Sequence, residues 1–403
     1  MIPLGAQEQE RELEERLAQH VERFAQRFGG GAPARRFFSP GRVNLMGAHL
    51  DYNGGPVMPM ALDRGTFVAL RPRTDDRLEL ASTLEQETLL TRLSSLPNAP
   101  AGRWFDYPLG VIVRLLGEQV QERSAIGADV LFGGNLPIGA GLSSSASICV
   151  GAAFALRSLW GRAPDPMACI GAALWSEREW VGVHCGIMDP YAVALSRHGH
   201  VLWLECKDAR YQHLPLDAGE ILVAVVDSGI RRELAKGDFN RRVAECREAF
   251  ARLRPLAREA QVLCEVPSTA VESAREQLGP LLYKRARHVT GEVERTRAAR
   301  TALLAGDHAE LGRCISATHA SLRDLYEVSV PELDCIAEAA LDHPGVLGAR
   351  LTGAGFGGCV VVLLQRKARA GLAEHLEGEF ARRFGRTPPV FFFRSDTGPR
   401  EFS

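Results

Sequence analysis

Apolar residues near the start of the chain recur every three to four positions among glutamates and arginines. That period places them on one face of a helix, so residues 7–27 are predicted to form an amphipathic helix rather than a signal peptide. The apolar face of this helix consists of Leu13, Leu17, Val21 and Phe24.

Short runs rich in β-branched and aromatic residues follow, interleaved with longer helical patterns. Residues 37–45 are predicted to be a strand broken by a Pro-Gly turn. Further strands are expected over residues 66–93 (several), 128–132, 201–204, 221–226 and 390–394, with a strand, a loop and a strand over 348–365. Helices are expected over residues 104–120, from the end of a glycine-rich loop to about 159, over 166–181, and through most of 240–340.

This mixture predicts an α+β protein. A chain of 403 residues is long enough for two or three domains and a large core. The composition changes near residue 210, so we expect an N-terminal domain over residues 1–210 and a C-terminal domain over residues 211–403.

The charge balance limits the possible partners. With 48 basic and 49 acidic residues the net charge is −1, which is unlike a protein that binds nucleic acid through its phosphates. Only four basic residues are lysines, and Lys207 is the first of them. The N-terminal half therefore has no Walker-type or kinase-strand lysine, and any phosphate bound there must be held by backbone N–H groups, hydroxyls, arginine or metal.

The cysteines and the hydropathy pattern indicate a cytoplasmic protein. Nine cysteines without a C-x-x-C pair, several of them in apolar surroundings, are typical of reduced core residues rather than of a disulfide or zinc framework. No apolar run approaches the roughly 18 residues that a membrane span needs. We expect no membrane and no nucleic-acid partner.

The glycine-rich stretch at residues 137–146 is the first candidate site. It follows a predicted strand and precedes a predicted helix, so its backbone N–H groups and the helix N-terminus can meet an anion. Hydroxyls that could reach phosphate or magnesium come from Ser143, Ser144 and Ser145. A flexible loop with a serine cap is the alternative.

Two carboxylates form the second candidate site. Glu177 shares a face of the predicted helix with apolar residues, where a carboxylate is costly unless it meets a cation such as magnesium; a solvated pair with Arg178 is the alternative. Asp189 is the only formally charged residue between Glu179 and Arg197. Because proline follows it, Asp189 could also be a simple helix cap.

The third candidate site is residues 41–55, which contain an arginine, a histidine, an aspartate and two asparagines in a segment rich in glycine. Such side chains suit a ligand rich in hydroxyl groups, because aspartate accepts from neighbouring hydroxyls and histidine or asparagine can donate or accept. A turn that uses Asp, Asn and Gly for backbone reasons is the alternative.

Together with residues 351–359, which read Leu-Thr-Gly-Ala-Gly-Phe-Gly-Gly-Cys, these segments resemble the galactokinase branch of the GHMP small-molecule kinases. The resemblance implies a ribosomal-S5-like N-terminal domain, a ferredoxin-like C-terminal domain and a site between them. It also implies ATP-dependent phosphorylation of a sugar at C1, with ATP and Mg²⁺ as cofactors, in a monomer or weak homodimer.

The resemblance further implies a role for each motif residue. Asp189 would be the base that faces the anomeric hydroxyl, and Arg42 would stabilise charge beside it. The magnesium of MgATP would be held by Ser144 and Glu177. Sugar contacts are implied for His49, Asp51 and Gly186, and ATP contacts for Gly139, Gly141, Ser143, Ser144, Ser145 and, against the adenine, Trp104.

Two departures from the pattern leave the sugar open. The family usually has glutamate where this chain has Ala48, and a sugar-binding tyrosine where it has Phe239. Galacturonate kinases share the Gly-Ala-His reading, so galactose, galacturonate, glucuronate and L-arabinose all remain candidate substrates. A non-catalytic sugar and ATP sensor is the alternative function, and a mevalonate-type kinase is disfavoured by the polar run at residues 49–55.

Overall fold

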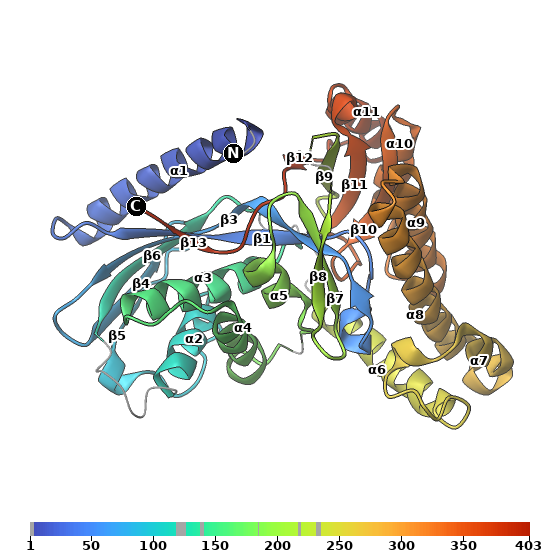
Figure 1. Ribbon diagram of the computed structural model, residues 1–403, viewed down its shortest axis with the longest axis horizontal. Coiled ribbons are helices and arrows are strands. Elements are labelled where there is room, and N and C mark those ends of the chain that lie inside the picture. The colour runs from blue at the N-terminus through green and yellow to red at the C-terminus, as the bar shows by residue number, and fades with distance from the viewer. Residues whose placement is uncertain (1–3, 118–125, 138–140, 184, 217–218, 231–234) are drawn as a thin grey trace.

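A six-stranded sheet forms the N-terminal part of the molecule (Figure 1). The computed structural model describes residues 4–117, 126–137, 141–183, 185–216, 219–230 and 235–403. The sheet order is β13-β1-β3-β6-β4-β5, and only β4 and β6 pair in parallel. Its strands are β1 (Arg35–Asn44), β3 (Pro59–Pro72), β4 (Arg77–Ser82), β5 (Leu89–Arg92), β6 (Ala128–Gly134) and β13 (Arg400–Phe402).

Helices cover both faces of this sheet (Figure 1). One face carries α1 (Leu4–Phe28), whose Leu13, Leu17 and Phe24 are buried as the amphipathic pattern predicts. A three-stranded sheet, formed by β2 (Pro56–Val57), β7 (His200–Glu205) and β8 (Tyr211–Pro215), contacts β3 through β7. The other face carries α2 (Asp106–Gly117), α3 (Ser144–Leu159), α4 (Pro166–Trp175) and α5 (Met188–Leu195).

The helix predicted over residues 166–181 is two segments. The α-helix α4 ends at Trp175, and a wider π-helical turn continues over Ser176–Trp180. Both segments pack on α2. A Cβ at Gly110 of α2 would meet the Ser176 hydroxyl at 2.4 Å, so only glycine allows this close approach. The wider turn contains Glu177, which is buried.

A second, four-stranded sheet with helices on its side forms the C-terminal part (Figure 1). Its order is β10-β11-β9-β12, all antiparallel. The strands are β9 (Ile221–Asp227), β10 (Val346–Thr352), β11 (Cys359–Gln365) and β12 (Val390–Phe393). The helices are α6 (Ala235–Leu253), α7 (Ser268–Ser273), α8 (Arg275–Leu304), α9 (His308–Ser321), α10 (Pro331–Asp342) and α11 (Leu372–Phe384).

The chain crosses back to the N-terminal sheet near its end, because β13 pairs with β1 through Arg36 and Phe402. The domain boundary near residue 210 stays a prediction, and residues 400–402 belong spatially with the first sheet. Within the described residues, no helix combines the length and the apolar character that crossing a membrane requires.

Candidate active site

A cavity of about 430 Å³ lies where the two sheets approach each other. The end of β1 and the loop after it form one wall, the start of α5 a second, and residues of α6 and the loop after β10 a third. Predicted residues from widely separated parts of the chain meet here: Arg42, Ala48, His49, Asp51, Gly186, Asp189 and Phe239.

Arg42 and Asp189 form a bidentate ion pair at this cavity. Arg42 Nε donates to Asp189 Oδ1 over 2.8 Å and Nη2 donates to Oδ2 over 2.9 Å, while Nη1 donates to the Gly141 carbonyl over 2.6 Å. The Ser143 hydroxyl also donates to Asp189 Oδ2. Asp189 is not the cap of α5, because Ile187 occupies that position. Its carboxylate is therefore directed toward the cavity and the serine loop rather than toward its own helix.

His49 has a strained backbone and an unpaired nitrogen. Its φ is 61°, a left-handed conformation that is uncommon for a residue with a side chain. Its Nδ1 is 2.8 Å from the Tyr52 hydroxyl. Within the part of the chain that the structure describes, His49 Nε2 and Asn44 Oδ1 are buried without a hydrogen-bond partner. Burial lowers the pKa of His49 to about 3, helped by Arg350 and Arg242, so the imidazole is neutral. Both orphaned atoms belong to cavity residues and suit a ligand with hydroxyl groups.

Asp51 packs directly against the backbone of Gly186. A Cβ at position 186 would lie 2.0 Å from Asp51 Oδ2, so any side chain there would displace the carboxylate. Burial, together with the nearby Asp189, raises the pKa of Asp51 to about 6, although backbone N–H groups and Arg42 act in the opposite direction. The result is a carboxylate that a ligand hydroxyl can reach and that is costly to leave without a partner.

The glycine-rich stretch that contains Gly141 meets the glycine loop after β10 at the edge of the same cavity. A Cβ at Gly141 would lie 3.8 Å from the Gly353 Cα, so the two motifs are adjacent. Gly141 and Ser143 have φ values of 68° and 57°. Gly139 lies outside the described residues. The Ser144 side chain is at the exposed N-terminus of α3.

Glu177 and Ser145 form the best candidate magnesium site. The Ser145 hydroxyl donates to the buried Glu177 carboxylate, whose pKa is raised to about 7, chiefly by burial. One carboxylate and one hydroxyl fit Mg²⁺, which commonly takes few protein ligands and completes its shell with phosphate and water. No group of three or more His, Cys, Asp or Glu that could hold a metal occurs among the described residues. This contact points to Ser145 as a partner of Glu177, and Ser144 as a magnesium ligand stays a prediction.

Two other predicted residues differ in their placement. Phe239 lines the cavity, with its ring centroid 5.3 Å from that of Tyr52 and 6.2 Å from that of His49. Trp104 does not line it: its indole Nε1 donates to the Glu87 carbonyl over 2.9 Å and its ring packs edge-on against Phe132. An adenine contact for Trp104 stays a prediction.

Sequence reasoning missed cavity residues whose partners are distant along the chain. Arg350 is buried and its three nitrogens donate to the backbone carbonyls of Leu45, Leu351 and Asn44. Burial lowers the pKa of Arg350 to about 10. Asn44 lies within the polar stretch at residues 41–55. Its position near Arg42, at the end of a predicted strand, could have identified it as a candidate site residue.

Three stretches of the chain match known protein families. The galactokinase galactose-binding signature covers residues 22–72, and the GHMP kinase N-terminal and C-terminal domains cover residues 107–197 and 299–377. The fold is thus that of a GHMP kinase, and the predicted two-domain α+β class is confirmed. A mevalonate kinase structure with a TM-score of 0.65 and 20% identity shares the fold alone.

Similar proteins narrow the family. The galactokinase of Chloroflexus aggregans is 40% identical over 90% of this chain and 92% of its own length, and that of Enterococcus faecalis is 37% identical over 94% and 98%. The crystal structure of Lactococcus lactis galactokinase complexed with galactose has a TM-score of 0.89 and 31% identity, covering 96% of this chain and all of that one. The chain belongs to the galactokinase family and is a sugar 1-kinase, as the motifs predicted.

Proposed function

We propose that this protein transfers the γ-phosphoryl group of ATP to the C1 hydroxyl of galactose. The observation that carries the proposal is the Arg42–Asp189 pair, which stands at the junction of a cavity with orphaned polar atoms and a serine-rich helix N-terminus. Galactokinase relatives that span nearly the whole chain support galactose as the first candidate sugar.

Asp189 is proposed to act on the sugar hydroxyl. Its carboxylate would accept the proton of the anomeric hydroxyl as the oxygen attacks phosphorus. Arg42 holds both carboxylate oxygens from one side, which fixes their direction, and its charge would stabilise the negative oxygens as they develop. His49 Nε2, Asn44 Oδ1 and the Asp51 carboxylate would bind ring hydroxyls and keep the sugar in register with Asp189.

The other half of the site would hold MgATP. Backbone N–H groups at the start of α3 and the hydroxyls of Ser143 and Ser144 would face the phosphates. Glu177 and Ser145 would hold Mg²⁺, which neutralises charge on the phosphates when it is bound. No lysine is needed for this arrangement, which agrees with the absence of lysine before residue 207.

A uronic acid is the second candidate substrate because of one feature of the cavity. Ala48 and Phe239 line it and bring a methyl and a phenyl group, where the family pattern has a carboxylate and a phenol. A glutamate at position 48 would repel the C6 carboxylate of galacturonate or glucuronate, and alanine does not. L-Arabinose, which lacks the exocyclic carbon, would also tolerate the alanine.

The decisive experiment is ADP release from ATP with a panel of galactose, galacturonate, glucuronate, L-arabinose and glucose, with ³¹P NMR of the product to locate the phosphate. We expect the highest kcat/KM with galactose and phosphate on C1. A tenfold preference for a uronic acid would overturn galactose as the substrate. Binding of sugar and ATP without turnover on any sugar would favour the sensor alternative.

A further inference from the structure

The loop that carries His49 is held from the C-terminal part of the molecule by a buried carboxylate on α8. Glu292 is fully buried, and its Oε1 accepts the backbone N–H groups of Gly47 over 3.1 Å and Ala48 over 3.0 Å. Its Oε2 accepts from the Thr318 hydroxyl over 2.8 Å and from Arg295 Nε over 2.9 Å. Four donors therefore fix this carboxylate, and two of them are the backbone immediately before His49.

One turn earlier on α8, His288 contacts the other side of the same peptide segment. His288 Nε2 lies 3.3 Å from the Ala48 carbonyl, and its Nδ1 lies 2.8 Å from the Ser321 hydroxyl. The Ala48 carbonyl can only accept, so Nε2 carries the proton and Nδ1 accepts from Ser321. Burial lowers the pKa of His288, which agrees with a neutral ring. Both the N–H and the C=O of Ala48 are thus bonded to α8.

The hydrogen bonds from Glu292 and His288 act on a segment whose backbone is strained. The left-handed conformation of His49 costs free energy and persists only where its surroundings hold it. Gly47 has a φ of 87°, and a Cβ there would meet the Pro56 carbonyl at 2.4 Å, so the turn is also tightly packed from the outside. With the Ala48 peptide fixed on both sides, the imidazole of His49 is kept against Tyr52 with Nε2 free for a ligand.

We propose that Glu292 is a positioning residue for sugar binding: it holds the Gly47–Ala48 backbone so that His49 faces the sugar. This inference rests on the proposed function, because it concerns the sugar end of the same site. Glu292 is not a lining residue of the cavity, so it acts through the loop and not on the substrate. The phosphate loop has no bond to Glu292 among the described contacts, so ATP binding should not depend on it.

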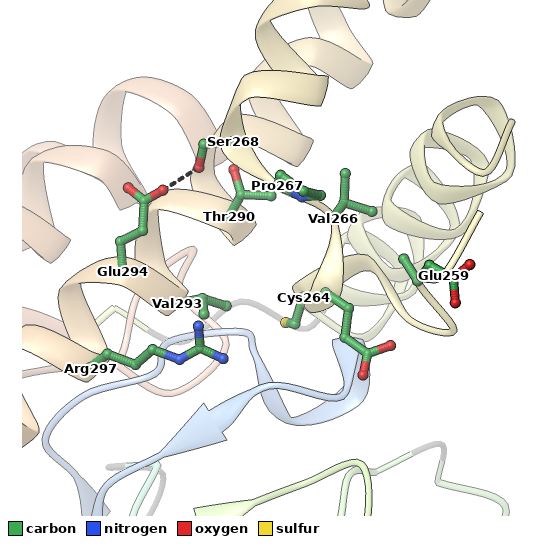
Figure 2. Close-up of a pocket in the computed structure, with 11 residues that line it drawn as sticks. Glu259, Cys264, Val266, Pro267, Ser268, Thr290, Val293, Glu294 and Arg297 are labelled. Carbon is green, nitrogen blue, oxygen red and sulfur yellow. Dashed lines mark hydrogen bonds between the residues drawn. The ribbon is translucent and has the colours of Figure 1, made fainter. Parts of the chain in front are cut away.

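Glu294, two positions further on α8, offers a matched control. Its side chain is exposed and accepts from the Ser268 hydroxyl at a separate cavity of about 470 Å³ (Figure 2). Figure 2 also shows Arg297 and Cys264 at that cavity, and neither Gly47 nor Ala48 is among its lining residues. A substitution at Glu294 thus shows the effect of changing a glutamate on α8 while the hydrogen bonds to residues 47 and 48 stay in place.

The experiment compares Glu292→Met with Glu294→Met by calorimetric titration with galactose and with MgATP. Methionine is similar in length to glutamate and accepts no strong hydrogen bond. We expect Glu292→Met to weaken galactose binding tenfold or more and to leave the MgATP dissociation constant within twofold, while Glu294→Met changes neither. Galactose affinity within twofold of the wild type, or an equal loss for both ligands, would overturn the proposal.

Thr318→Val decides the question if Glu292→Met does not fold. This variant removes one donor to Glu292 Oε2 and keeps the shape, so we expect a two- to fivefold loss of galactose affinity with MgATP unchanged. Unchanged galactose affinity would then overturn the proposal. Turnover tests the proposed function and equilibrium binding tests Glu292, so the two can fail separately: a wild type that binds galactose without phosphorylating it refutes only the former.

Discussion

The sugar end and the phosphate end of the site are built differently. At the sugar end, buried side chains bond to backbone groups from distant parts of the chain: Glu292 accepts the N–H of Gly47, and Arg350 donates to the carbonyls of Leu45 and Asn44. At the phosphate end, the exposed parts are mainly backbone, as at Gly141 and Gly353. The first region presents fixed polar side chains, and the second presents glycine turns and a helix N-terminus.

The difference follows from what each region has to bind. Distinguishing sugars that differ in one hydroxyl needs polar atoms in fixed directions, because an unmatched buried group is costly. Phosphate groups carry the same charge in every nucleotide and can be bound by N–H groups, hydroxyls and a metal ion. Substitutions at the sugar end should therefore change which sugar is phosphorylated and how fast. Substitutions at the phosphate end should change the magnesium concentration that the reaction requires.

The largest effect is expected at the junction of the two regions. Asp189→Asn should lower kcat by about a thousandfold, because asparagine cannot accept the proton while it still fills the site between Arg42 and Ser143. ATP binding and the unfolding midpoint should change little. The measurement is steady-state turnover with titration of ATP, using the exposed Asp208→Asn as the control. Retention of a tenth of kcat would show that Asp189 is not the base.

Ala48→Glu tests the sugar end alone. If the wild type accepts a uronic acid, a glutamate in this largely buried position should cost about 1–4 kcal/mol against the substrate carboxylate. That corresponds to roughly a fivefold to nearly thousandfold loss of kcat/KM for the acid, with galactose favoured in relative terms. The measurement is kcat/KM for galactose, galacturonate, glucuronate and L-arabinose before and after the change. An unchanged ratio between galactose and the acids would show that position 48 does not select the sugar.

Asp51→Asn should lower the activity and raise the stability of the protein. Loss of a charged acceptor for sugar hydroxyls should reduce kcat/KM by about ten- to hundredfold. The folded pKa of about 6 lies above the ordinary value of 3.8, so ionisation of Asp51 opposes folding increasingly as pH rises from about 4 to 6. Asparagine removes this cost and should stabilise the protein by about 1–3 kcal/mol at pH 7. Urea unfolding at pH 7 and pH 4 checks this. A stability gain that persists undiminished at pH 4 would contradict the titration argument.

Glu177→Gln tests the phosphate end and should have the smallest effect. A neutral amide is a weaker ligand for Mg²⁺, so the magnesium concentration that gives half-maximal rate should rise on the order of tenfold, with a lower kcat. The KM for the sugar should stay the same, because Glu177 does not line the sugar cavity. A magnesium titration with the exposed Glu179→Gln as the control measures it. An unmoved magnesium curve would remove Glu177 from the metal site.

The two regions also differ in how far the sequence could predict them. Local patterns were sufficient for α1, because its buried face follows from the spacing of nearby residues. The strand that carries Arg42 was predicted to be broken by a Pro-Gly turn, which is wrong: β1 is continuous from Arg35 to Asn44, and only its register shifts between Pro40 and Arg42. The end of α4 at Trp175 was not predictable, since the π-helical turn at Glu177 depends on packing against Gly110. Pairings such as Glu292 with Ala48 join positions 244 residues apart and leave no periodic signal in one sequence. The candidate magnesium ligand Ser145 shows the same limit. Three adjacent serines look alike in the sequence, and only the direction of each side chain in the fold distinguishes them.

The pairing of β13 with β1 has a consequence for synthesis in the cell. Strand β1 is made early, but the partner of Arg36 is Phe402, which leaves the ribosome 366 residues later. At about 5–20 residues per second this interval is roughly 20 to 70 seconds. During that time one edge of β1 has no strand beside it and can pair with another nascent chain. The edge of β1 at residues 36–38 therefore gains its strand partner only after translation has reached residue 402, and we expect a chain stalled within the C-terminal helices to expose that short edge.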